Sequence, residues 1–179
     1  TYGLYTDFLD QDAYSATRVN ITMGGLGTIE FDQGNSGNGI AAYDNVMPTA
    51  WEEAHGAGLS GGVKTVLGVG ASDNIQYASP TFLGTSFAIT HSRDVGSADT
   101  NDKTTGTGTL TLARGTDVTL KINPSMGTEI LSGLNLYAGG SIIERYDNQG
   151  GDEDKLEAVG AVTYALGPIE VGVMWSGMY

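Results

Sequence analysis

The sequence predicts an all-β protein, an antiparallel β-barrel with an apolar outside and a wet inside. Two observations predict this fold class. Apolar and polar residues alternate with a period of two along one segment after another, which is typical of strands with two different faces. Short turns also alternate with long polar connections, as in a barrel with tight turns at one end and loops at the other. The 179 residues fit a single domain, residues 1–179.

The clearest strand pair is the run RVNITMGGLGTIEFDQ, residues 18–33, in which a glycine turn joins two alternating halves. One phase of the alternation is apolar in both halves, with Val19, Ile21, Met23, Ile29 and Phe31. The opposite phase is polar and partly charged, with Arg18, Asn20, Glu30 and Asp32. We therefore expect these four polar residues to line the wet face.

Further alternating segments predict the remaining strands. They are residues 74–77, 86–90, 109–112, 118–123, 133–146, 156–166 and 169–176, and a strand-like run, TYGLYTDF, opens the chain. We expect turns after residue 78, at Gly115-Thr116 and at Gly167-Pro168. Lys121 lies in the polar phase of its segment and is expected on the wet face. At typical strand dimensions, about nine or ten strands fit this length.

Composition excludes several classes of function. Acidic residues outnumber basic ones by 21 to 8, and the net charge of −13 argues against nucleic acid as a partner. The absence of cysteine excludes disulfides and thiolate metal sites. No catalytic or phosphate-binding motif is present, and the run GVGASD at 68–73 lacks the glycine spacing of a dinucleotide turn. We therefore expect neither an enzyme nor a bound cofactor.

Residues 34–73 form a connection of forty residues with nine glycines. It is far longer than the roughly 12–15 residues beyond which loops are usually functional or disordered, and we interpret it as functional. The alternating pattern alone also fits a soluble antiparallel sandwich or barrel. The simple apolar faces and the excess of tyrosine over phenylalanine, nine to four, favour a transmembrane barrel with aromatic girdles.

Four stretches, in this order, resemble the trimeric general porins of Gram-negative bacteria, and most closely the alphaproteobacterial type. They are RVNITMGGLGTIEFDQ, AAYDNVMPTAWEEAHG, NIQYASPTFLGTSF and YALGPIEVGVMWS. The resemblance implies an outer-membrane homotrimer for passive diffusion of small hydrophilic solutes and ions, in contact with the lipid bilayer and lipopolysaccharide. It also implies that the loop at 34–73 folds into the barrel and narrows the pore. Because general porins have about 16 strands and this chain ends in GMY, we expect a partial chain.

The same resemblance implies the residues of the pore constriction. Asp44, Glu52 and Glu53 would form its acidic edge, opposed by Arg18 on the wall and by Lys121 if it lies near. The net charge of −13 predicts a preference for cations. Two plainer interpretations stay open: Glu52 and Glu53 begin a surface helix, or Arg18 pairs with Glu30 across its hairpin.

The acidic loop near residue 150 has two interpretations. Asp152, Glu153 and Asp154 provide closely spaced oxygen ligands of the kind that calcium prefers, but without the spacing of an EF-hand, so a solvated loop is the competing interpretation.

The function of the whole protein also has a second interpretation. The acidic, glycine-rich composition fits a secreted β protein with a structural or adhesive role at a surface. A continuous apolar band around a closed barrel, about 25 Å tall with aromatic rims, would distinguish the channel from such a protein.

Overall fold

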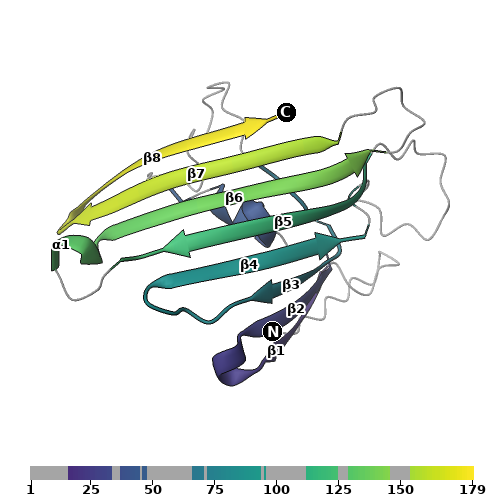
Figure 1. The fold of residues 1–179 in the computed structure, drawn as a ribbon, viewed down its shortest axis with the longest axis horizontal. Coiled ribbons are helices and arrows are strands. Elements are labelled where there is room, and N and C mark those ends of the chain that lie inside the picture. The colour runs from purple at the N-terminus through teal and green to yellow at the C-terminus, as the bar shows by residue number, and fades with distance from the viewer. Residues whose placement is uncertain are drawn as a thin grey trace, which may run out of the picture.

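The computed structural model describes residues 16–33, 37–44, 46–47, 66–70, 72–93, 95, 112–124, 129–145 and 154–179. Within these residues the protein is all-β, with one antiparallel sheet of eight strands in chain order (Figure 1). The strands are β1 (Thr17–Thr22), β2 (Thr28–Gln33), β3 (Asn74–Ala78), β4 (Thr85–Ser92), β5 (Leu112–Ile122), β6 (Leu134–Arg145), β7 (Lys155–Leu166) and β8 (Ile169–Met178). Three short helices accompany them among the described residues: η1 (Gly24–Leu26), η2 (Gly39–Tyr43) and α1 (Glu129–Ser132). The described sheet is open, since β1 and β8 do not pair with each other.

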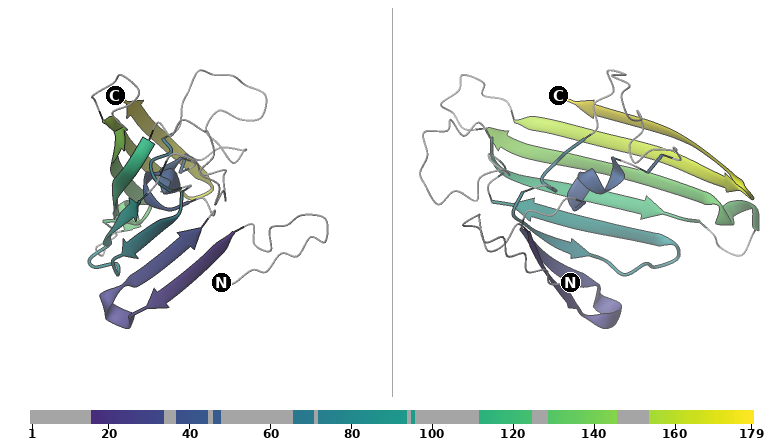
Figure 2. Two further views of the ribbon diagram at one scale, coloured as in Figure 1. Left: turned by 90° about the vertical axis from the view of Figure 1, so that its right-hand side faces the viewer. Right: turned by 180° about the vertical axis from the view of Figure 1, so that it is seen from behind.

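The connections between strands differ strongly at the two ends of the sheet. At one end, short connections join β1 to β2 (23–27), β3 to β4 (79–84) and β7 to β8 (167–168), and residues 123–133 join β5 to β6. The connections at the opposite end span 34–73, 93–111 and 146–154. The two longest connections thus lie at one end, as predicted, although the β5-to-β6 connection at the other end is longer than 146–154. Figure 2 shows that the sheet curves and that η2, from the longest connection, lies on its concave side.

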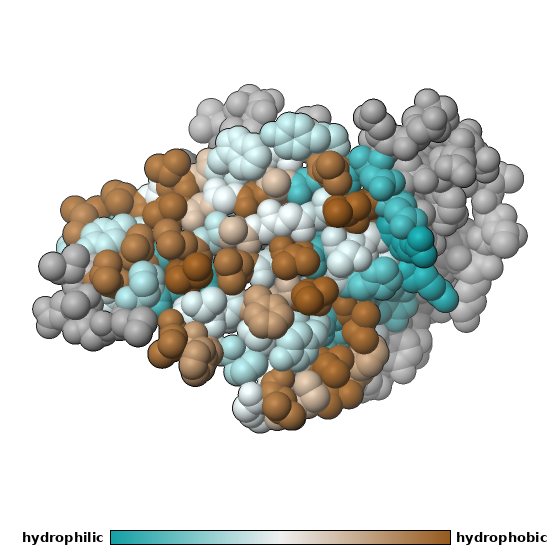
Figure 3. All heavy atoms as spheres, viewed as in Figure 1, coloured by the Kyte–Doolittle hydropathy of each residue, from teal (hydrophilic) through white to brown (hydrophobic). Residues whose placement is uncertain are grey.

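The convex face of the sheet is apolar across all eight strands. The strand registers place the apolar phase of every strand on this face, beginning with Val19 opposite Phe31 and Phe31 opposite Ile75. Sixteen large apolar side chains on this face are at least 36% exposed: Val19, Ile21, Phe31, Ile75, Phe87, Ile89, Val118, Leu120, Ile142, Leu156, Val162, Leu166, Ile169, Val171, Val173 and Trp175. Figure 3, which views this face, shows the apolar side chains spread over its length.

One predicted turn is wrong. Gly115-Thr116 does not end a strand, because β5 runs without interruption from Leu112 to Ile122. The register against β6 shifts between Leu112 and Gly115, so the extra residue is absorbed as a β-bulge. This merger of two predicted strands, together with the position of residues 1–8 outside the described residues, accounts for eight strands in place of nine or ten.

None of the described helices is long and apolar enough to cross a membrane.

Candidate functional site

A row of polar side chains crosses the concave face from β2 to β7. Successive strand registers place its members directly opposite one another: Glu30, Gln76, Thr90, Asp117, Ser141 and Glu157. We call this set the polar row. It contacts two described stretches of the long connection, residues 37–44 and 66–70, which we call the inner segment.

Asp117 is the central acceptor of the polar row. Its Oδ2 atom accepts backbone hydrogen bonds from Ile40 at 2.9 Å and from Val69 at 3.1 Å. Asp117, Ile40 and Val69 are all buried, at 2% exposure or less. Because hydrogen bonds to a charged acceptor are stronger than neutral ones, this carboxylate holds both stretches of the inner segment to β5.

Two further members of the polar row, one on each side of Asp117, repeat this arrangement. On one side, Gly39 N–H donates to Gln76 Oε1 at 3.1 Å. On the other side, Gly68 N–H donates to Glu157 Oε2 at 2.6 Å, while Glu157 Oε1 lies 3.0 Å from Lys155 Nζ. The inner segment is thus bound through its backbone, by side chains that the sheet positions on three different strands.

Four glycines make this close approach possible. Gly39 (φ +58°) and Gly68 (φ +53°) have left-handed conformations, and a Cβ atom at either position would overlap Asp117 Oδ2. On the sheet, a Cβ at Gly139 would lie 2.8 Å from Ile40 Cγ2, and one at Gly115 would lie 2.6 Å from Val69 Cγ1. The glycines therefore allow the backbone to approach the carboxylate and allow two apolar side chains to reach the sheet.

An aromatic contact extends the interface beyond the polar row. The rings of Tyr43 in η2 and Tyr137 in β6 meet edge to face, with their centroids 5.1 Å apart. Burial raises the pKa of Tyr43, although a hydrogen bond with Thr119 opposes this shift. Lys121 Nζ lies 5.4 Å from the centroid of the Tyr137 ring, and Lys121 is exposed. This lysine therefore adds a positive charge to the polar face beside the inner segment.

Arg18 is bound within its own hairpin. Its Nη2 atom lies 2.7 Å from Asp32 Oδ2, and its Nε atom lies 3.2 Å from Glu30 Oε1. The Asp32 side chain is fully buried, and Asn20 lies opposite Glu30 on the same face. The pairing of Arg18 with Glu30 across the hairpin is thus present, and Asp32 joins it. Whether Arg18 also acts on permeating ions stays a prediction.

The structure places only some of the other predicted site residues. Asp44 is partly buried just after η2, and its N–H donates to Ala41 O at 3.2 Å. Since η2 contacts β4 to β7, Asp44 and Arg18 belong to regions supported by different strands. Glu52, Glu53, Asp152 and Glu153 lie outside the described residues, whereas Asp154 is exposed just before β7. No described group of three or more acidic or histidine side chains is arranged to hold a metal ion.

Sequence reasoning does not single out the polar-row carboxylates Asp117 and Glu157. Both occupy the polar phase of their strands, and Asp117 stands four positions before Lys121 in that phase. The polar phase predicts that a residue lies on the wet face. It does not show which of these residues accepts a hydrogen bond from a backbone N–H that is distant in the sequence. Gly68 and Val69, which donate to these carboxylates, lie in the GVGASD run, for which the sequence indicates no role.

Comparison of the chain with protein-family models, curated proteins and solved structures found no match.

Proposed function

We propose that the sheet is part of the wall of a transmembrane β-barrel that forms a water-filled channel, similar to the trimeric general porins. The channel would lie in the outer membrane of a Gram-negative bacterium and pass small hydrophilic solutes and ions by diffusion. The observation that carries this proposal is the exposed apolar convex face, which crosses all eight described strands. The rest of the wall would come from strands other than these eight.

The apolar face supports a lipid environment for a simple energetic reason. Soluble monomers rarely expose a contiguous apolar patch larger than a few hundred square ångströms. Here residues such as Val173, Ile169 and Val171 are 76%, 61% and 51% exposed on a single strand. In water this face would carry a large hydrophobic cost, at about 25 cal/mol for each Å² exposed. Facing lipid removes that cost.

The concave face supports the channel interpretation. It carries the polar row, the cluster of Arg18 with Glu30 and Asp32, and Lys121, so water would wet it. The inner segment lies across this face and would narrow the pore as a constriction loop. Its Asp44, together with Glu52 and Glu53 from the same connection, would contribute negative charge, and the net charge of −13 favours cations.

The open edges of the described sheet favour a second candidate function. Each of β1 and β8 has one pairing neighbour among the described strands, and an exposed edge can pair with another chain. A secreted β protein with a structural or adhesive role at a surface would use these edges for assembly. It would also need a second layer of protein over the convex face.

Planar-bilayer recording of the full-length gene product tests the proposal. We expect stepwise conductance and, in a salt gradient, a reversal potential that shows cation preference. Protein that co-floats with vesicles but gives no conductance would overturn the channel. Protein that stays out of the vesicles and assembles into fibres or sheets would instead support the structural or adhesive role.

A further inference from the structure

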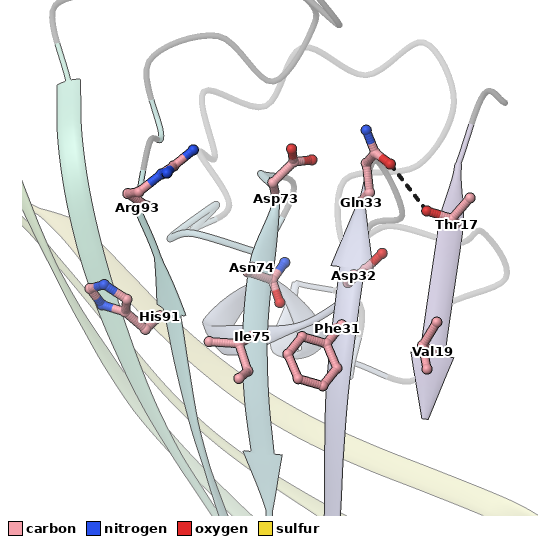
Figure 4. A pocket seen from close by; sticks show the side chains of 10 residues that line it. All are labelled: Thr17, Val19, Phe31, Asp32, Gln33, Asp73, Asn74, Ile75, His91 and Arg93. Atoms are coloured by element: carbon pink, nitrogen blue, oxygen red, sulfur yellow. Dashed lines mark hydrogen bonds between the residues drawn. The ribbon is translucent and has the colours of Figure 1, made fainter. Parts of the chain in front are cut away.

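A groove of about 510 Å³ opens on the convex face where β1 to β4 approach the long connections (Figure 4). Its floor is apolar and contains Val19, Phe31 and Ile75, which are 42% to 55% exposed. Figure 4 shows Asp73 and Arg93 beyond this floor, at the end of the groove nearest the long connections. The groove thus has an apolar body and a charged end, and its volume is in the range of ligand-binding sites.

The change from apolar to polar occurs at the same level on neighbouring strands. Along the convex face, Phe31 is followed two positions on by Gln33, and Ile75 is preceded two positions back by Asp73. On β4, His91 and then Arg93 follow Ile89 in the same phase. Two residues of strand advance the chain by about 7 Å, so the polar rim lies within one such step of the apolar floor. In the membrane that we propose, this level marks the boundary between acyl chains and headgroups.

The rim carries one negative and one positive charge that do not neutralise each other. Asp73 directly precedes Asn74 and Arg93 directly follows Ser92, and Asn74 and Ser92 are paired, so Asp73 and Arg93 face each other across the end of β3 and β4. Both are exposed, and neither forms an ion pair with a described residue. At the same end of the sheet, by contrast, Arg114 is satisfied by Glu144, with Nε and Oε1 2.8 Å apart.

We propose that this groove binds a zwitterionic phospholipid, an inference that rests on the proposed membrane location. Arg93 would donate hydrogen bonds to the phosphate, a geometry that guanidinium groups favour, and Asp73 would accept from the ammonium group. One acyl chain would lie over Val19, Phe31 and Ile75. The rim matches a headgroup that carries both charges better than one that is only anionic, because Asp73 would repel the latter.

Lipid retention measured by native mass spectrometry of the full-length protein tests the site. The protein is purified in detergent and titrated with phosphatidylethanolamine, phosphatidylglycerol or diacylglycerol. We expect selective retention of phosphatidylethanolamine, reduced at least fivefold in Arg93→Gln and in Asp73→Asn. The matched control is Arg114→Gln, which removes the same charge from an ion pair already formed at the same end, and we expect its retention to change less than twofold.

The possible outcomes separate this site from the proposed function. Protein that inserts into vesicles but retains the three lipids equally, or retains phosphatidylethanolamine equally in Arg93→Gln, overturns the lipid site alone. Protein that does not insert overturns both proposals. The chain has no cysteine, so Ile75→Cys introduces a single reactive thiol in the floor. A rapid disulfide between two copies at this position would show that a second copy fills the groove, and it would also overturn the lipid site.

Discussion

The backbone N–H of Ile40 donates to Asp117 Oδ2 at 2.9 Å, although 77 positions separate the two residues in the chain. The same oxygen accepts from Val69, and Glu157, two strands away on β7, accepts from Gly68. A strand side chain thus replaces the backbone partners that the inner segment lacks. This contact holds the inner segment against the sheet, and it makes the consequences of several substitutions predictable.

Asp117→Asn should weaken the attachment of the inner segment. The variant keeps the size of the side chain but loses the charge, and hydrogen bonds to a charged group contribute about 1.5–3 kcal/mol. We expect the free energy of unfolding in a urea titration to fall by about 2 kcal/mol. The control is Glu144→Gln, whose exposed pair with Arg114 should contribute less than about 1 kcal/mol. Equal effects of the two substitutions would contradict the role of Asp117.

Gly39→Ala should be more destabilising than Gly24→Ala. The two glycines have nearly the same conformation, with φ of +58° and +59°. An alanine in this left-handed conformation costs about 1–2 kcal/mol, so this cost should be equal in the two variants. A Cβ at Gly24 meets no atom within 4 Å, whereas one at Gly39 overlaps Asp117 Oδ2. We expect a further 1–3 kcal/mol, roughly, for Gly39→Ala in the same titration. If the two variants lose equal stability, the close approach to Asp117 is unimportant.

Val173→Lys reports the environment of the convex face. Val173 is 76% exposed, so in water the substitution should change stability by no more than about 0.5 kcal/mol. Facing lipid, a lysine costs about 2–4 kcal/mol at the middle of a bilayer. We expect the larger loss for the protein folded in vesicles, with Val173→Thr as the control of similar shape. A near-neutral Val173→Lys would argue for a solvated face.

Arg18→Gln should remove the ion pairs that Arg18 forms with Glu30 and Asp32. The Asp32 side chain is fully buried and 2.7 Å from Arg18, so loss of this charged contact should lower the free energy of unfolding by about 1.5–3 kcal/mol. Asp32→Asn in the Arg18→Gln background should restore part of this loss. A double-mutant cycle measures the coupling, and strictly additive effects would show that the pair is energetically unimportant.

Neutralising the acidic residues of the long connection should lower cation preference. The variant combines Asp44→Asn, Glu52→Gln and Glu53→Gln, and the measurement is the reversal potential in a salt gradient. A matched triple variant, Asp73→Asn, Glu144→Gln and Asp154→Asn, removes the same charge from exposed positions near the ends of strands. We expect a clear shift only in the first variant. An unchanged reversal potential would remove these three residues from the constriction.

The strands and their two faces could be predicted because the signal for them is local. Alternation with a period of two needs only neighbouring residues, and it predicted which side of β2, β4 and β8 is apolar. The failure at Gly115 has the opposite cause. A glycine before a threonine resembles a turn, but Gly115 lies within β5. A glycine is needed there because Val69 and Ile143 occupy the space where a Cβ would be.

By itself, the sequence determined an all-β chain with one apolar and one polar face and with its two longest connections at a single end, since strand period and turn chemistry act over a few residues. Only the tertiary structure decided what lies on the polar face. Asp117 and Glu157 become acceptors for the inner segment because curvature and register bring residues 48 and 89 positions away into hydrogen-bond range. The ion pairs of Arg18 were predictable only in part. Its partners are near in sequence, and the pairing with Glu30 was an open interpretation, but only the folded hairpin shows that Arg18 contacts both Glu30 and Asp32.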